Sequence, residues 1–290
     1  MNELLSNVLF FATAATYVAA SVIFLRYLLG GKGDIGKLGP RLVTVGAVLH
    51  LGYILLASFV FNICPVGGIH FSLSVGSMLM CAAYLGARKR WRIELSGAFI
   101  APLALASLLA SRFVGRGEPT ESLKSTMLPI HVTLNLLGVA LLSLAFSAAV
   151  LYLLQERLVK SKKIDGMSRR LPPLDALDRA EHKFLLAGFP LLTLGIITGT
   201  VWARHVETGG LAEVLRAMFG FVTWAVIAGG LFLRAASGWR GRRAAYGTIA
   251  GFGFVVIVLA FYLFRKEPPH PATRVVSEAT AAVLSQAVQP

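Results

Sequence analysis

Residues 171–203 read LPPLDALDRAEHKFLLAGFPLLTLGIITGTVWA, and this stretch decides the fold. Pro172 and Pro173 form a stiff entry, after which Asp175 and Asp178 stand near the start of a helix, where carboxylates favour the helix dipole. Residues 184–203 then carry no charged side chain. An uncharged apolar run of this length is enough to cross a bilayer, so the stretch predicts a membrane-spanning helix.

The whole chain has the composition of a polytopic membrane protein. It has 290 residues, of which 56% are hydrophobic and 14% charged, and its mean hydropathy is +0.71. One soluble core could not bury that much apolar surface, and the charges are gathered into short clusters. We therefore expect an all-α integral membrane protein.

Further apolar runs recur on both sides of the opening stretch. Their lengths, about 17–25 residues, match the thickness of a bilayer. They predict a bundle of about eight transmembrane helices, near residues 5–28, 42–61, 71–87, 94–112, 128–154, 184–203, 217–235 and 246–264.

Basic residues orient this predicted bundle. Twenty of the 28 Lys and Arg side chains fall on one side of the expected membrane, and eight fall on the other. Short loops rich in Lys and Arg stay in the cytoplasm, so we expect both termini outside. This bias and the attraction to anionic lipid headgroups account for the pI of about 10.3, and we expect no nucleic-acid partner.

The two ends of the chain differ in character. The first segment follows Asn2 and Glu3 rather than a basic lead and has no small-residue cleavage site before Arg26, so we expect a retained first helix. We assign residues 1–266 to one membrane domain. Residues 267–290 are polar and contain four prolines, so we expect a loosely ordered tail outside the membrane.

Several catalytic classes lack their motifs here. Cys64 and Cys81 are too far apart along the expected helix to form a disulfide, and the chain has no C-x-x-C. No P-loop and no H-E-x-x-H motif occurs. We therefore expect no independent enzymatic activity, although no motif decides the question.

Three blocks at fixed spacing resemble a known family. LPPLDALDR at 171–179, GFPLLTLGIITGTVWA at 188–203 and GWRGRRAA at 238–245 are similar to the membrane core of the cytochrome c assembly family, of the CcsA/ResC type with its HemX-like branch. The resemblance covers roughly residues 40–270. It implies a protein of the cytoplasmic or inner membrane that holds and presents haem, with lipid and cytochrome c assembly proteins as partners.

Histidines are the candidate haem ligands. His70, His131, His205 and His270 all fall at or just beyond the expected outer helix ends, and imidazole is the usual axial ligand of haem iron. The resemblance narrows this set to two. His131 matches the outer histidine that opens the helix before the LPPL loop, and His270 matches the histidine after the last helix. Histidines at a membrane interface are also common without any metal.

The chain departs from the family between Trp202 and Trp224. Haem-handling members carry a segment of the type W-G-x-x-W-x-W-D-P there, whereas this chain has Glu207, Leu211, Glu213 and Val214 at the corresponding positions. An aromatic platform against the porphyrin is therefore missing. We expect any haem to be bound weakly or transiently.

His50 poses a separate question, because it lies near the middle of the expected second helix. An imidazole in hydrocarbon needs a partner inside the bundle, and intramembrane histidines are candidates for cofactor binding. The alternative is a buried histidine bonded to a hydroxyl or a carbonyl. His182, on the cytoplasmic side, is expected to be solvated or at headgroup level.

Two functions remain open. The first is haem handling at the outer face during cytochrome c biogenesis, with His131 and His270 as axial ligands. The second is that of a HemX-like, non-catalytic protein that supports or regulates tetrapyrrole synthesis through contacts with a biosynthetic enzyme on the cytoplasmic side.

The asymmetry of charge makes a topological prediction. A reporter fused after Pro290 should report an outside location, and one inserted at Lys162 should report a cytoplasmic location, because Lys162 lies in the most basic loop. Protease or alkaline-phosphatase accessibility measures both. The reverse pattern would move all the outer histidines to the cytoplasmic face.

Overall fold

A computed structural model describes residues 2–29, 35–60, 64, 66, 69–91, 93–113, 127–162, 166–203 and 211–263. Within these ranges the regular structure is entirely helical. The elements are α1 (Asn2–Leu28), α2 (Ile35–Val60), α3 (Ile69–Trp91), the 3₁₀ turn η1 (Glu94–Ser96), α4 (Gly97–Phe113), α5 (Met127–Lys160), α6 (Gly166–Arg170), α7 (Leu174–Ala203), α8 (Leu211–Ser237) and α9 (Arg242–Leu263).

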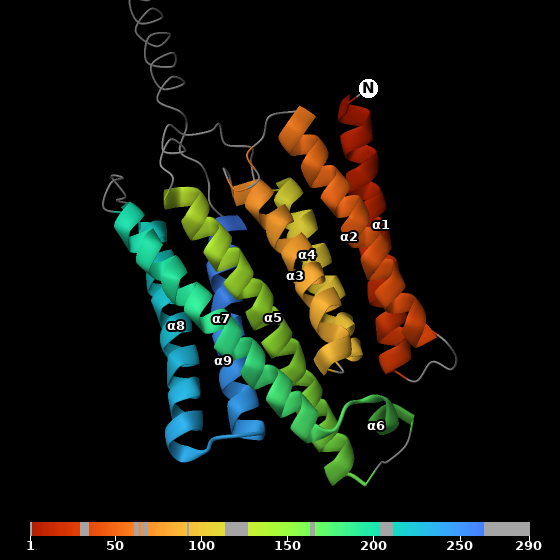
Figure 1. Cartoon of the computed structure of the whole chain (residues 1–290), viewed down its shortest axis with the longest axis vertical. Helices are drawn as coiled ribbons and strands as arrows, with labels where there is room; N and C mark the ends of the chain where they lie inside the picture. The colour runs from red at the N-terminus through yellow and green to blue at the C-terminus, as the bar shows by residue number, and fades with distance from the viewer. Residues whose placement is uncertain are drawn as a thin grey trace, which may run out of the picture.

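The long helices alternate in direction along the bundle (Figure 1). We call the end that carries α6 and the α8–α9 turn the inner end, and the opposite end the outer end. Among the described residues, seven helices are long and apolar enough to cross a membrane: α1, α2, α4, α5, α7, α8 and α9. The predicted all-α integral membrane bundle is confirmed.

The expected third span, residues 71–87, is helical but is not among the seven. Its last turn carries Arg88, Lys89 and Arg90, and Ser74 and Ser77 are buried on it. The Ser77 hydroxyl donates a 2.7 Å hydrogen bond to the carbonyl of Ala104 on α4. Because α3 packs against α2, α4 and α5, it faces protein where the other helices face lipid, and a polar composition is tolerated there.

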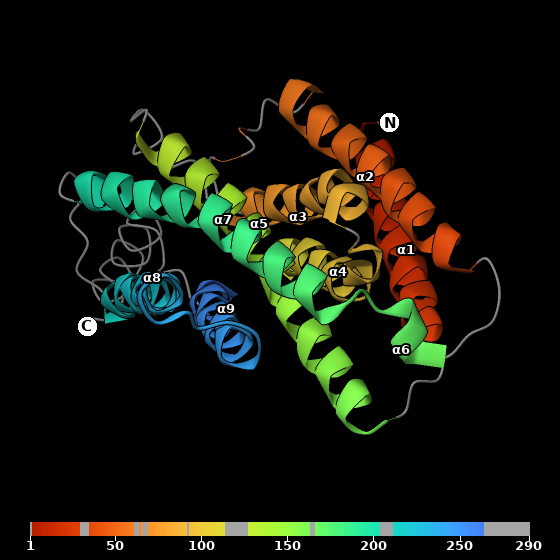
Figure 2. The same ribbon diagram turned by 60° about the horizontal axis from the view of Figure 1, so that its bottom comes forward.

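The helices form two groups joined by α5 and α7 (Figures 1 and 2). Helices α1 to α4 lie on one side of the crossed pair α5 and α7, and the α8–α9 hairpin lies on the other. Helix α8 contacts α7 and α9, and α9 also contacts α5. Many aliphatic and aromatic side chains of α1 and α8 are exposed, as expected for lipid-facing surfaces.

Glycines allow α5 and α7 to approach closely. A Cβ on Gly138 of α5 would lie 2.7 Å from Leu192 of α7, and one on Gly188 of α7 would lie 3.3 Å from the carbonyl oxygen of Gly138. Small residues at helix crossings let the backbones come together where hydrophobic association offers no driving force. This crossing fixes the centre of the bundle.

Described basic residues gather at the inner end. They include Arg26, Arg88, Lys160, Arg170 and Arg234, each near the inner end of its own helix. Arg170 donates a 2.7 Å hydrogen bond to the Tyr27 carbonyl, which ties α6 to α1. The start of α1 and the end of α9 both lie at the outer end (Figure 1), and their outside location stays a prediction.

Helix α2 offers a matched pair of glycines to test the packing. A Cβ on Gly46 would lie 2.5 Å from the Tyr17 ring, whereas one on Gly52 would meet nothing within 4 Å. We expect Gly46→Ala to lower the free energy of unfolding by about 1–3 kcal/mol through overpacking. Gly52→Ala should be neutral or stabilising by roughly 0.5–1 kcal/mol. Unfolding of the detergent-solubilised variants measures both, and equal effects would contradict the packing described here.

Candidate functional site

His131 lies in the second turn of α5, at the outer end. Its Nδ1 is 2.7 Å from the carbonyl oxygen of Gly195 on α7. A carbonyl oxygen only accepts, so Nδ1 carries the proton and donates. In the neutral form of the ring the lone pair is therefore on Nε2, and within the described residues Nε2 has no hydrogen-bond partner.

Asn135 holds the same turn in place. Its Nδ2 donates a 2.8 Å bond to the backbone carbonyl of His131. Nδ2 also lies 3.2 Å from Nδ1 of His131. Because Nδ1 already donates to Gly195, this second approach is a close contact between two N–H groups, and the amide is satisfied by the backbone carbonyl.

Two glycines of α7 form the floor under these side chains. A Cβ on Gly199 would lie 2.4 Å from Cε1 of His131, and one on Gly195 would lie 2.7 Å from the Asn135 amide. A side chain at Gly199 would push the imidazole away from the Gly195 carbonyl, and one at Gly195 would displace the Asn135 amide. The GFPLLTLGIITG block therefore serves to hold His131 as well as to pack α5.

This arrangement fits an axial ligand of haem iron. Histidines that bind metals commonly donate their other ring N–H to a backbone carbonyl, which fixes the tautomer and aims the free nitrogen. His131 has this bond and is half-buried. Among the described residues no cluster of three or more His, Cys, Asp or Glu side chains forms a metal site, so an incoming iron would rely on single imidazoles.

The structure describes the other outer histidines only in part. His205 and His270 lie outside the described residues, and for His70, at the start of α3, only the backbone is described. Helices α7 and α9, which lead to His205 and His270, end at the outer end where α5 begins (Figure 1).

The positions that lack the family's tryptophans surround the start of α8. Leu211 is 75% exposed and Val214 is 53% exposed. Only the backbone of Glu213 is described, and Glu207 lies outside the described residues. Two exposed aliphatic side chains, Leu211 and Val214, therefore occupy the segment where the related family carries its tryptophan-rich motif.

His50 is fully buried between three helices. Its Nε2 is 2.8 Å from the hydroxyl of Ser74 on α3, and its Nδ1 is 3.2 Å from the hydroxyl of Tyr17 on α1. Both ring nitrogens are thus engaged by hydroxyls. This is the hydroxyl-bonded alternative considered from the sequence, and an iron ligand at His50 would have to displace one of the two bonds.

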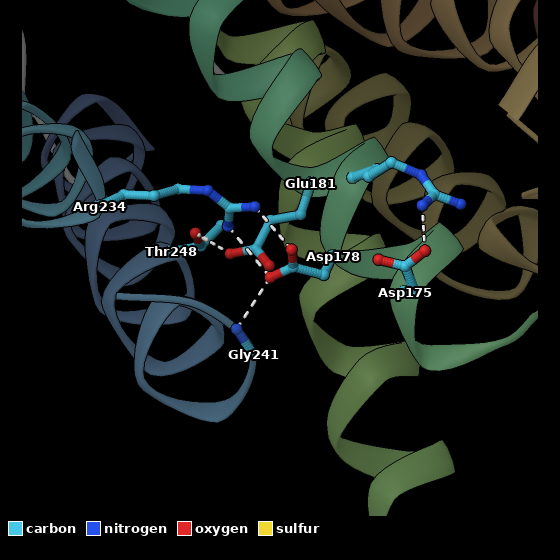
Figure 3. A network of polar contacts seen from close by, with 7 residues as sticks. Asp175, Asp178, Glu181, Arg234, Gly241 and Thr248 are labelled. Carbon is cyan, nitrogen blue, oxygen red and sulfur yellow. Dashed lines mark hydrogen bonds and ion pairs between the residues drawn. The ribbon is translucent and has the colours of Figure 1, made fainter. Parts of the chain in front are cut away.

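A second polar cluster, at the inner end, joins α7 to the α8–α9 hairpin (Figure 3). Asp178 accepts two hydrogen bonds from the Arg234 guanidinium, at 3.0 and 2.6 Å, and a third from the backbone N–H of Gly241 at 2.8 Å. One turn further along α7, Glu181 accepts a 2.5 Å bond from the Thr248 hydroxyl of α9. We call these five residues the inner clamp.

The inner clamp adds contacts that the sequence blocks did not predict. Asp175 pairs with Arg179 on the surface of α7, as a residue near a helix start can, whereas Asp178 turns inward to Arg234. The GWRGRR block supplies the N–H of Gly241 to Asp178. The signal that could have revealed this was the i, i+3 spacing of Asp178 and Glu181, which places both on one face of a helix.

The sequence also led to expectations for the two cysteines and for His182. Cys64 is exposed, Cys81 is buried, and both are free thiols, as expected. His182 was expected to be solvated or at headgroup level; it is half-buried, and its Nδ1 has no hydrogen-bond partner among the described residues. It follows Glu181 directly and therefore adjoins the inner clamp.

Comparisons with known proteins agree with the blocks identified in the sequence. Residues 66–267 match the family described as Cytochrome C assembly protein. A cytochrome c biogenesis protein CcsA of Guillardia theta is 27% identical over 281 residues, covering 87% of this chain and 91% of that protein. The CcsA of Heterosigma akashiwo is 26% identical over 241 residues, covering 69% and 73%. Protein HemX of Brevibacillus brevis is 25% identical over 198 residues, covering 67% and 72%.

The His131 tautomer can be tested directly. In protein labelled with ¹⁵N-histidine, we expect one ring with a protonated Nδ1 and an unprotonated Nε2 at neutral pH, because Gly195 accepts from Nδ1. The signal should vanish in His131→Gln. It should change in Gly199→Ala, where a Cβ would displace the ring, but not in Gly220→Ala, where a Cβ meets nothing within 4 Å. A protonated Nε2 in the wild-type protein would contradict the geometry.

Proposed function

This chain belongs to the cytochrome c assembly protein family, and we propose that it takes part in cytochrome c biogenesis by holding haem at the outer face of the membrane. The observation that carries the proposal is the orientation of His131. Its Nδ1–H is fixed by the Gly195 carbonyl, so the lone pair of Nε2 is free to bind iron at the outer end of the bundle.

We propose His270 as the second ligand. Helix α9, which precedes it, ends at the same end of the bundle as the start of α5, and imidazole is the ordinary partner in a bis-histidine site. When bound, haem would supply an iron centre, and the imidazoles of His131 and His270 would hold it. The protein's own contribution is to hold the imidazoles at matched depth and in the correct tautomer.

The same proposal implies a membrane location, a lipid-facing surface and a protein partner. We place the chain in the cytoplasmic or inner membrane, with lipid against the exposed apolar faces of α1 and α8. The polar tail, residues 267–290, would extend from the outer face. A cytochrome c assembly protein is the proposed partner on that side.

Haem should be held weakly. An aromatic ring against a porphyrin buries on the order of 150–250 Å², and at roughly 25 cal/mol per Å² each missing ring removes several kcal/mol of contact. Leu211 and Val214 offer smaller exposed side chains at the start of α8. Transient retention suits a protein that passes haem on.

A second function is favoured by one observation. Protein HemX of Brevibacillus brevis is matched over 67% of this chain, and the tryptophan-rich segment is missing here. A HemX-like protein would support or regulate tetrapyrrole synthesis through cytoplasmic contacts with a biosynthetic enzyme. Such a protein would not need haem at the outer end.

Haem titration of the purified protein separates the two functions. We expect added hemin to give a six-coordinate low-spin spectrum, because two imidazoles bind the iron. His131→Ala or His270→Ala should each convert it to high spin or abolish binding. His182→Ala and His205→Ala are the controls and should leave the spectrum unchanged.

Two outcomes would contradict the assignment. Equal loss from all four histidine variants would show that the ligand pair is wrong. A wild-type protein that stays colourless with excess hemin would exclude haem handling and favour the HemX-like function.

A further inference from the structure

The inner clamp is the most highly bonded polar cluster among the described residues, and haem handling assigns it no part. Asp178 accepts three hydrogen bonds, and its side chain and that of Arg234 are each only 10% exposed. Glu181 and Thr248 are buried beside them. All of these bonds run from α7 to the α8–α9 hairpin (Figure 3).

The turn of the hairpin is fixed against α5 as well. Gly241 has a φ of +65°, which favours glycine, and its N–H is the donor to Asp178. A Cβ at Gly241 would lie 2.5 Å from the Tyr152 hydroxyl oxygen of α5. The inner end of the hairpin is therefore held by two helices at one point.

Toward the outer end, the described side chains of the hairpin make fewer polar contacts than those of the inner clamp. Trp224 stacks on Phe189 and donates a 2.9 Å bond to Thr193, near the middle of α8. Phe252 stacks on Phe146 of α5 with ring centroids 4.4 Å apart. Leu211, Val214 and Met218, in the outer half of α8, are all exposed. A helix held at one end and at its middle has its tilt fixed by the two attachments together, so loss of the inner one would leave the helix free to pivot about its middle.

We propose that Asp178 and Arg234 are positioning residues that set the tilt of the α8–α9 hairpin relative to α5 and α7. The tilt decides where the outer end of α9 stands relative to His131. This second step rests on the proposed function, since it supposes that His131 and His270 bind one haem.

The tilt can be measured without haem. The experiment uses a protein in which the exposed Cys64 is replaced by Ser. Spin labels at Thr133→Cys on α5 and Ile257→Cys on α9, both exposed positions, would report the distance between the outer halves of these two helices. We expect a narrow distance distribution for the wild-type clamp. Asp178→Asn and Arg234→Gln should shift and broaden it, because each leaves a buried charge unpaired.

The matched control is Asp175→Asn. Asp175 lies one turn earlier on α7 and pairs with Arg179 at the exposed surface, so this change should leave the distribution narrow. If a neutralising variant fails to fold, Arg234→Lys keeps the charge but loses the bidentate geometry, and it should give an intermediate width. An unchanged distribution in all the Asp178 and Arg234 variants would overturn the proposal.

Haem titration of the same variants tests the second step. With Asp178→Asn, we expect loss of the low-spin spectrum even though His131 and His270 are intact. If the distance changes while the spectrum stays wild-type, the coupling to the ligands is overturned. If the distance changes but neither the variant nor the wild-type protein binds hemin, the clamp is supported and the proposed haem function fails.

Discussion

The close approach of α5 and α7 is the constraint on which the rest of the bundle depends. Inside a bilayer, apolar side chains gain little by leaving lipid for protein, so helix pairs need backbone contact and polar bonds to associate. Gly138 and Gly188 provide the first at the crossing. Both helix groups pack on this pair, and both candidate polar sites include a residue of α7.

Several buried polar side chains are paired across the helix interfaces. A buried donor or acceptor without a partner costs free energy, so such groups occur in pairs or small networks. His50 is bonded between Tyr17 and Ser74, and Ser77 reaches a carbonyl of α4. These bonds explain how α3 can be polar within a membrane bundle. They also separate His50, with both nitrogens engaged, from His131, whose Nε2 has no hydrogen-bond partner among the described residues.

The sequence predicts the helices well because their signal is local. Apolar runs and basic clusters located the long helices and their alternation, and the blocks around LPPL and GFPLLTLGIITG indicated the family. The sequence could also single out His131, but not the bond to Gly195 that fixes its tautomer. That bond depends on the register of α5 against α7, which no local pattern encodes.

The pairing of Asp178 with Arg234 was missed for a related reason. A carboxylate near a helix start has a sufficient local explanation in the helix dipole, and Asp175 conforms to it. Which of two nearby carboxylates turns inward depends on where α8 ends and how the turn at Gly241 is formed. Segments 56 residues apart meet there, and only the three-dimensional packing selects Asp178.

Helix α7 links the two ends of the protein physically. Gly195 and Gly199 receive His131 at the outer end, and Asp178 and Glu181 bind the hairpin at the inner end. At 1.5 Å per residue these contacts are separated by about 25 Å along one helix. Both sets of contacts act on the same helix, so the bonds at its inner end and the contacts with His131 at its outer end each constrain the alignment of α7.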